Sequence, residues 1–164
     1  AYLNLGRRLL LAEQIRDQQL DQALAFQPDL AIVAAGGNDL MRPSHDLTQI
    51  EASIDTIVGS LRAAGADVVM IAPFDITRTD LLPAEQRDRW HQIIEQLSAL
   101  AQRVTERHGG IFVDYREHPA GAEASIYSAD TIHLSARGHA IAAAELLTAL
   151  STVAEHRAAQ PAIG

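Results

Sequence analysis

Residues 30–39, LAIVAAGGND, join an unbroken apolar run to a glycine-rich turn. An apolar run without polar alternation predicts a strand that is buried on both faces, as in a parallel sheet. Two further runs of this kind occupy residues 68–72 and 111–113. The three runs together predict a parallel sheet, and side chains at the carboxyl ends of its strands are the first candidates for a functional site.

The segments between these runs have the period of helices. Apolar residues recur at helical spacing in residues 50–61 and 90–104. Two Ala-rich segments, 7–26 and 136–155, also favour helices. Boundary residues agree, because Asp46 with Gln49 resembles a capping box, Pro83 suits a first helical turn, and Gly109-Gly110 suits a helix end. Strands that alternate with helices predict an α/β domain with helices on both faces of the sheet.

Composition fits one domain of this class. Hydrophobic residues make up 48% of the 164 residues but aromatic residues only 4%, which favours helices packed on a buried sheet. We expect one domain over residues 1–155 and a frayed tail at 156–164. The 13 basic and 21 acidic residues give a net charge of −8, which argues against nucleic acid as a partner. The absence of cysteine excludes a disulfide framework and a thiolate nucleophile.

The chain shows no signal for a membrane. Residues 1–5 have no basic region, and no apolar stretch approaches membrane-spanning length. We therefore expect a cytoplasmic protein without a membrane span. Secretion stays open because the N-terminus looks incomplete, as argued below, and the sequence gives no indication of oligomeric state.

Two groups of polar residues follow the predicted strands or loops: Gly36-Gly37-Asn38-Asp39 and Asp130-Thr131-Ile132-His133. Each alone is compatible with ordinary turn chemistry. Together they suggest more, because an aspartate three residues before a histidine can accept a hydrogen bond from the imidazole and fix its tautomer. Such a histidine can act as a base, and an asparagine amide can donate to an oxyanion. These are three parts of an acyl-transfer site.

The same residues resemble the SGNH hydrolases, also called GDSL-type lipases and esterases. Gly36-x-Asn38-Asp39 matches their G-x-N-D block and Asp130-x-x-His133 their D-x-x-H block, with similar residues around both. The resemblance implies a three-layer α/β/α, flavodoxin-like fold and cofactor-free hydrolysis of a small-molecule ester. It also implies that His133 is the general base and that Asp130 orients it. Asn38 would be an oxyanion donor.

The resemblance leaves the second oxyanion donor open. In this family a backbone N–H of a glycine supplies it, often five positions after an asparagine. Counting from Asn4 leads to Leu9, and Gly6 is the nearby glycine. Either N–H could serve, and Gly6 is the residue we select.

The chain departs from the family at its first block, because no Gly-Asp-Ser occurs in it. Ser44 and Ser128 fall on loops near the expected site, but turn or cap roles suit them better. In a family-like sheet the missing block ends a central strand, between a strand holding Asn4 and the strand at 31–35. We therefore expect the natural protein to begin upstream, with the nucleophile there. This fragment alone would then be inactive.

Two other functions remain open. One is a catalytically inactive SGNH-like binding domain. The other is a flavodoxin-like regulatory domain, which ranks lower because Gly36-Gly37 lacks the G-x-G-x-x-G spacing. We expect no metal site, although His139 with Asp130 would offer suitable ligands. His45 and Asp46 could line a substrate mouth, but a solvated loop is the simpler interpretation.

Overall fold

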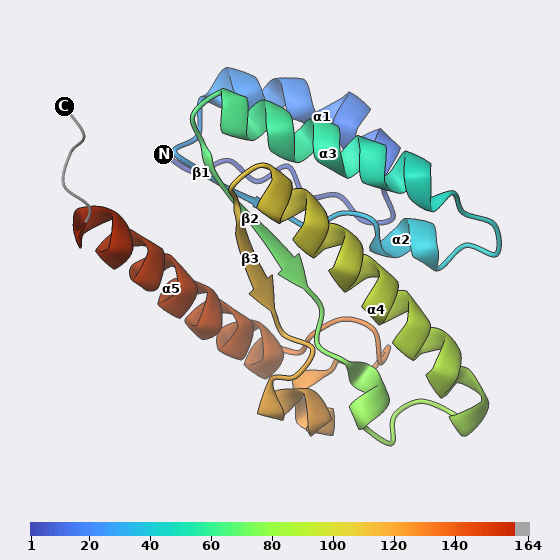
Figure 1. Ribbon diagram of the computed structural model, residues 1–164. Coiled ribbons are helices and arrows are strands. Elements are labelled where there is room, and N and C mark those ends of the chain that lie inside the picture. The colour runs from blue at the N-terminus through green and yellow to red at the C-terminus, as the bar shows by residue number, and fades with distance from the viewer. Residues whose placement is uncertain (160–164) are drawn as a thin grey trace.

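The computed structural model describes residues 1–159 and has a three-stranded parallel sheet with helices on both faces (Figure 1). The strands are β1 (Leu30–Val33), β2 (Asp67–Ala72) and β3 (Ile111–Asp114), in the order β1-β2-β3. All pairs are parallel, with Ile32 opposite Val69 and Met70 opposite Phe112. The three predicted strands and the α/β fold are therefore confirmed.

Helices α1, α3 and α4 lie on one face of the sheet, and α5 lies on the other (Figure 1). Their bounds are α1 (Ala12–Phe26), α3 (Leu47–Ala63), α4 (Ala84–Arg107) and α5 (Ala136–Ala159). Four short helices occupy the connections: α2 (Gly37–Leu40), η1 (Ile76–Arg78), η2 (Pro119–Ala122) and η3 (Ala124–Ile126). None of the helices in the described part of the chain is long and apolar enough to cross a membrane.

The helix boundaries follow from local chemistry. The Asp46 carboxylate accepts hydrogen bonds from the amides of Thr48 and Gln49 at the start of α3. Pro83 is the residue before the first turn of α4. Gly109 adopts a φ of 62° after the end of that helix, a conformation that glycine accepts without steric cost.

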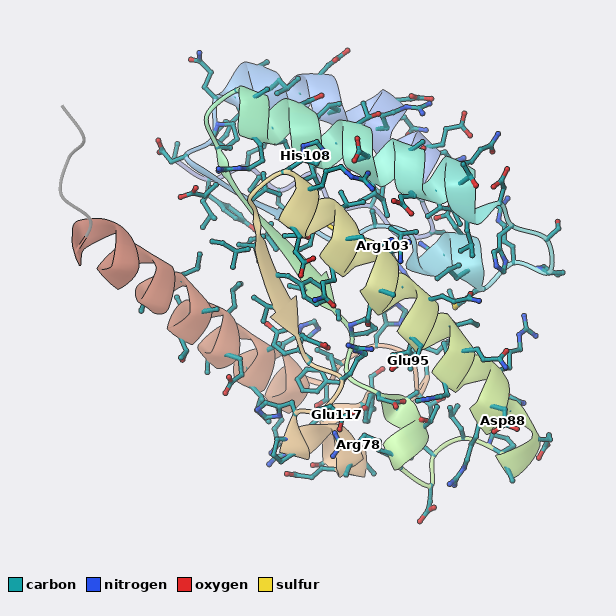
Figure 2. All side chains as sticks on the ribbon, in the orientation of Figure 1. Arg78, Asp88, Glu95, Arg103, His108 and Glu117 are labelled. Atoms are coloured by element: carbon teal, nitrogen blue, oxygen red, sulfur yellow. The ribbon has the colours of Figure 1, made fainter. Side chains whose placement is uncertain are left out.

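Side chains that alternate along the strands build a core on each face. Val33, Val68 and Met70 are buried against α1, α3 and α4, whereas Val69 and Val113 pack in a second core to which α5 contributes. Ion pairs join α3 to α4 and its C-cap residue at the surface, and Figure 2 shows Arg103 of α4 and the C-cap residue His108 on the side that faces α3. The α4 helix is thereby held on the sheet, with its first turns near the carboxyl ends of the strands.

The amino-terminal segment differs from the prediction. Residues 1–11 are not helical, and α1 begins at Ala12 rather than near residue 7. The cause is a turn at Leu9, whose φ of 64° is incompatible with a right-handed helix. At the other end, α5 continues to Ala159, beyond the expected boundary at 155, and the rest of the expected tail, 160–164, lies outside the described residues.

The edge of β1 that does not pair with β2 is open. Within residues 1–159, β1 has no second strand beside it, and Leu30 and Ile32 are 41% and 55% exposed. A groove of about 760 Å³ separates β1 from residues 1–6. The expectation of a strand at Asn4 is therefore wrong for this chain, because no intervening strand is present with which that segment could pair.

Candidate active site

The Asp130–His133 pair has the geometry of an oriented base. His133 Nδ1 lies 2.6 Å from Asp130 Oδ2. The other carboxylate oxygen of Asp130 accepts hydrogen bonds from the Ser128 hydroxyl at 2.6 Å and from the backbone amides of Ile132 and His133 at 3.1 and 3.0 Å. Because Asp130 engages Nδ1, the exposed imidazole can present Nε2 as the atom that exchanges a proton.

Hydrogen bonds join the two ends of the loop that holds Asp130 and His133. Tyr127 and Leu134 form an antiparallel bridge, and the Ser128 amide donates to the His133 carbonyl at 2.8 Å. The buried Tyr127 hydroxyl donates to Gly121 O, and burial raises the pKa of this phenol to about 12. Thr131, at a φ of 58°, makes the tight turn at the tip of the loop. The position of His133 therefore depends on the loop as a whole.

The Asp130 carboxyl should titrate well below its usual range. The Ser128 hydroxyl is the largest cause of the lowered pKa, followed by the backbone amide and the imidazole of His133. Because the folded pKa lies below the unfolded one, this contribution to loop order is complete above about pH 4 and is lost as the pH falls toward the folded pKa. Carboxyl ¹³C NMR of the chain should show this low titration.

The matched variants are Ser128→Ala and Ser44→Ala. The first should raise the Asp130 pKa toward its ordinary value, because it removes the strongest donor. The second should leave the titration unchanged, since Ser44 lines a different groove. An Asp130 carboxyl that titrates at the ordinary value in the unsubstituted chain would contradict the hydrogen-bond pattern.

The second group of candidate residues follows β1. Gly36 has a φ of 95°, and a Cβ there would lie 3.0 Å from Leu97 Cδ1, so glycine is required at this turn. The Asn38 amide donates to Leu10 O at 3.0 Å, and the buried Asp39 carboxylate accepts from the Ala12 amide at 3.0 Å. Burial raises the pKa of Asp39, and the Ala12 hydrogen bond partly offsets this effect. The turn thus ties residues 10–12 to α2.

These contacts distinguish the two candidates for a backbone oxyanion donor. The Gly6 amide donates to Asn4 Oδ1 at 2.9 Å, within its own segment. Leu9 directly precedes the residue that accepts from Asn38, and within residues 1–159 no acceptor lies at hydrogen-bond distance from its amide. Its left-handed backbone is one that glycine adopts readily. Of the two, the Leu9 N–H is the one without an acceptor, and the choice between it and Gly6, the residue selected from the sequence, stays a prediction.

Replacing Leu9 by glycine should stabilise the chain. The left-handed conformation costs a non-glycine residue about 1 kcal/mol, and the Leu9 side chain is 75% exposed, so little burial is lost. We expect a gain of about 0.5–1 kcal/mol in the free energy of unfolding, measured by urea denaturation. Leu9→Ala, which keeps the Cβ, should give no gain; an equal gain in both variants would assign the effect to the exposed side chain.

The Gly36–Asp39 group directly follows β1, whereas Asp130 and His133 lie on the loop between η3 and α5. Figure 1 shows the loop before α5 beyond the ends of β2 and β3, and α2 follows β1 after a short turn. Ser128 is occupied as a donor to Asp130, and Ser44 lines a groove of about 270 Å³ between α1, α2 and α3. His45 and Asp46 line the same groove. Among residues 1–159 no hydroxyl is within hydrogen-bond distance of His133 Nε2, and no group of residues there could hold a metal ion.

Two polar residues outside the predicted site, Asp75 and Arg78, order the segment that follows β2. Asp75, buried after β2, caps η1 through Thr77 and lies 3.3 Å from His91 Nδ1. Arg78 donates to two carbonyls, those of Arg116 and His118, and so joins η1 to the segment around Glu117 (Figure 2). Asp75 lies three residues after the end of β2, and an acidic residue so close to a predicted strand was the signal available for it, but nothing local in the sequence marks Arg78.

Comparison with known proteins gives a consistent result. The GDSL-like lipase/acylhydrolase family matches residues 5–141. No curated protein matches the chain by sequence.

Solved structures with the same fold include three esterases or hydrolases. The acetylxylan esterase of Geobacillus stearothermophilus has a TM-score of 0.71 and 20% identity, over 90% of this chain and 70% of its own. An esterase of Pseudoalteromonas has a TM-score of 0.70 and 10% identity, over 93% of this chain and 78% of its own. An alpha/beta hydrolase from the metagenome of Lake Arreo, Spain, has a TM-score of 0.72 and 21% identity, over 90% of this chain and 71% of its own.

The family match covers most of the chain and includes Asn38, Asp130 and His133. The fold and the order of these residues along the chain agree with it. This chain belongs to the GDSL-like lipase/acylhydrolase family.

Proposed function

We propose that this protein hydrolyses carboxylic esters through a serine acyl-enzyme, with His133 as the general base. The observation that carries the proposal is the 2.6 Å contact between His133 Nδ1 and an Asp130 carboxylate that three further donors hold in place. Such a pair orients Nε2 toward a hydroxyl nucleophile. The nucleophile is a serine outside the 164 residues, since neither Ser44 nor Ser128 contacts His133 Nε2.

The reaction follows from these groups. The serine oxygen attacks the ester carbonyl while its proton passes to His133 Nε2, and the oxyanion is stabilised by the Asn38 amide and the Leu9 N–H. The tetrahedral intermediate collapses, His133 returns the proton to the departing alcohol, and an acyl-enzyme remains. Water then attacks the acyl carbon, again through His133, and releases the acid and the free serine.

The names of similar structures support this assignment. Catalytic mutants of the acetylxylan esterase replace a serine, an aspartate and a histidine by alanine, and that aspartate precedes that histidine by three residues. Asp130 and His133 have the same spacing. The Pseudoalteromonas esterase was solved inhibited by monoethylphosphonate. An organophosphonate is the type of reagent that an activated serine attacks.

The test is labelling of the natural protein with a fluorophosphonate probe, followed by peptide mass spectrometry. We expect one labelled serine, and loss of labelling in His133→Ala. His139→Ala is the matched control, because His139 is exposed on the first turn of α5 and should leave labelling unchanged. Labelling that is equal in His133→Ala and the unsubstituted protein would overturn the role of His133.

One observation favours a second candidate, the catalytically inactive binding domain. The Asn38 amide already donates to Leu10 O, so an oxyanion would have to replace that acceptor or share the amide. If the natural protein folds, binds an ester or its phosphonate analogue in calorimetry and yet forms no labelled serine, this second function is the correct one.

A further inference from the structure

The groove of about 270 Å³ between α1, α2 and α3 has polar walls and lies beside the turn that holds Asn38. We propose that this groove binds a neutral, polyhydroxylated ring, such as a pyranose sugar, as the alcohol part of the ester. The binding of the ring rests on the groove itself. Only the assignment of the ring to the alcohol of the ester rests on the proposed function.

The groove adjoins the proposed oxyanion donors. Asp39 lines it and directly follows Asn38. Leu11 also lines it and directly follows Leu10, whose carbonyl accepts from the Asn38 amide. Figure 1 shows α2, which carries Asn38, beside the first turns of α3. An ester whose carbonyl lies at these donors can therefore extend its alcohol part into the groove.

The charged groups of the groove are already balanced by partners. Arg16 Nη2 lies 3.6 Å from Glu13 Oε1 in an ion pair, and Arg42 attracts the buried carboxylate of Asp39. The Asp46 carboxylate accepts hydrogen bonds from two backbone amides at the start of α3. An anion, a cation or a zwitterion would therefore meet no unbalanced charge. A neutral ligand fits this lining better.

Several polar groups of the groove have unused hydrogen-bonding capacity. Among residues 1–159, no hydrogen bond involves the side chains of Arg42, Ser44 or Gln49, which together offer donors and acceptors. The Asp39 side chain is buried, and its carboxylate accepts from the backbone amides of Ala12 and of Asp39 itself. A carboxylate has about four acceptor sites, so this buried group can accept further hydrogen bonds. Hydroxyl groups, which both donate and accept, match this mixture.

The apolar part and the size of the groove suit a single ring. Leu11, Ile50 and Ala52 line it beside the polar groups. A sugar ring presents C–H groups on its faces and hydroxyl groups around its edge, so it can contact both kinds of lining. Pockets for drug-sized ligands span roughly 300–1,000 Å³. A groove of about 270 Å³ therefore takes one ring rather than an extended chain.

The first experiment measures binding to the natural protein by ¹⁵N NMR. Methyl β-D-glucopyranoside should shift the amide signals of Asp39, Gln49 and Ser53 in a saturable way, because these residues line the groove. Cyclohexanol has a ring of similar size with one hydroxyl group. It should bind at least about tenfold more weakly, because it leaves polar groups of the groove unpaired. Glucuronate, an anion, and serine, a zwitterion, should also bind more weakly than the glucoside.

A matched pair of variants tests the groove directly. Arg42→Met removes the guanidinium group but keeps a long, unbranched side chain, and it should weaken binding of the glucoside by about tenfold or more. Arg7→Met is the control, because Arg7 is also exposed and lies outside the groove. It should leave the affinity unchanged. Both substitutions are at exposed positions, and circular dichroism should show that both variants fold.

The second experiment asks whether the bound ring is the alcohol of the ester. The measured quantity is the specificity ratio, which is kcat/KM for 6-O-acetylglucose divided by kcat/KM for ethyl acetate. The two esters share an acyl group and differ in the alcohol. We expect a ratio of about ten or more in the natural protein and in Arg7→Met, and a fall toward unity in Arg42→Met.

The outcomes separate this proposal from the proposed function. Binding of the glucoside in the groove without hydrolysis of either ester supports the sugar site and counts against the proposed catalysis. Hydrolysis of both esters without shifts at Asp39, Gln49 and Ser53 overturns the sugar site and leaves the catalysis intact. Equal affinity for cyclohexanol or serine, or unchanged affinity in Arg42→Met, also overturns it. Binding with a specificity ratio near unity overturns the assignment of the ring to the alcohol.

Discussion

Gly138→Ala is expected to lower the free energy of unfolding by about 3 kcal/mol or more. A Cβ at this position would lie within van der Waals overlap of the carbonyl oxygen of Ile126, and also 3.1 Å from Leu134 Cβ. Ile126 is fully buried and its carbonyl accepts from the Ser135 amide at 2.8 Å, so the backbone cannot yield without losing that bond. Overpacking of this kind commonly costs about 1–3 kcal/mol, and contact with backbone lies at the upper end. Urea denaturation measures the loss.

The control is Gly37→Ala. A Cβ on Gly37 meets only Leu97 Cδ2, at 3.8 Å, which is an ordinary contact. Its φ is not in the left-handed range, so alanine fits the backbone. We expect a change within about 1 kcal/mol. Equal losses for the two variants would mean that the close approach at Gly138 is not what makes glycine necessary there.

Gly138→Ala should also displace His133, the proposed general base. Ser135, which follows the Asp130–His133 loop, is the residue bonded to Ile126, and Leu134 forms the bridge to Tyr127. Displacement of α5 from Ile126 would pull on both contacts. A variant that folds at low temperature should therefore show an altered His133 imidazole environment in NMR spectra, which Gly37→Ala should not.

The sheet could be predicted because its determinants are local and repeated. Apolar runs such as 68–72 specify strands buried on both faces, and capping residues such as Asp46 mark where helices begin. The pairing of Asp130 with His133 could also be predicted, because three residues on a tight loop bring the two side chains together. These predictions succeeded because each depends on residues that are close together in the sequence.

What the sequence did not indicate depends on contacts between distant segments. The turn at Leu9 contradicts the helical preference of residues 7–11. Asn38 and Asp39, which bond to Leu10 and Ala12 just after this turn, lie 28 and 27 residues away from them. The necessity of Gly138 arises from a carbonyl twelve residues earlier, at the end of η3, whose path only the fold determines. The strand expected at Asn4 failed for a related reason, since a strand exists only beside a partner.

His133→Ala is expected to reduce ester hydrolysis by the natural protein by about a thousandfold or more. The imidazole both accepts the serine proton and returns it to the leaving alcohol, and loss of a positioned base costs about 10²–10⁴-fold in rate. Loss of the whole proton-transfer step falls at the upper end of this range. The measurement is the initial rate with p-nitrophenyl acetate, corrected for the rate without enzyme.

Asp130→Asn tests how that base is held. Asparagine keeps the size of the side chain but can donate to Nδ1, which favours the tautomer that carries its proton on Nε2 and cannot accept the serine proton. We expect kcat to fall by at least about a hundredfold with little change in KM, because in the proposed reaction Asp130 acts through His133. His139→Ala should retain the full rate. A large rise in KM with unchanged kcat in Asp130→Asn would instead place this carboxylate in substrate binding, since His133 would then remain a competent base.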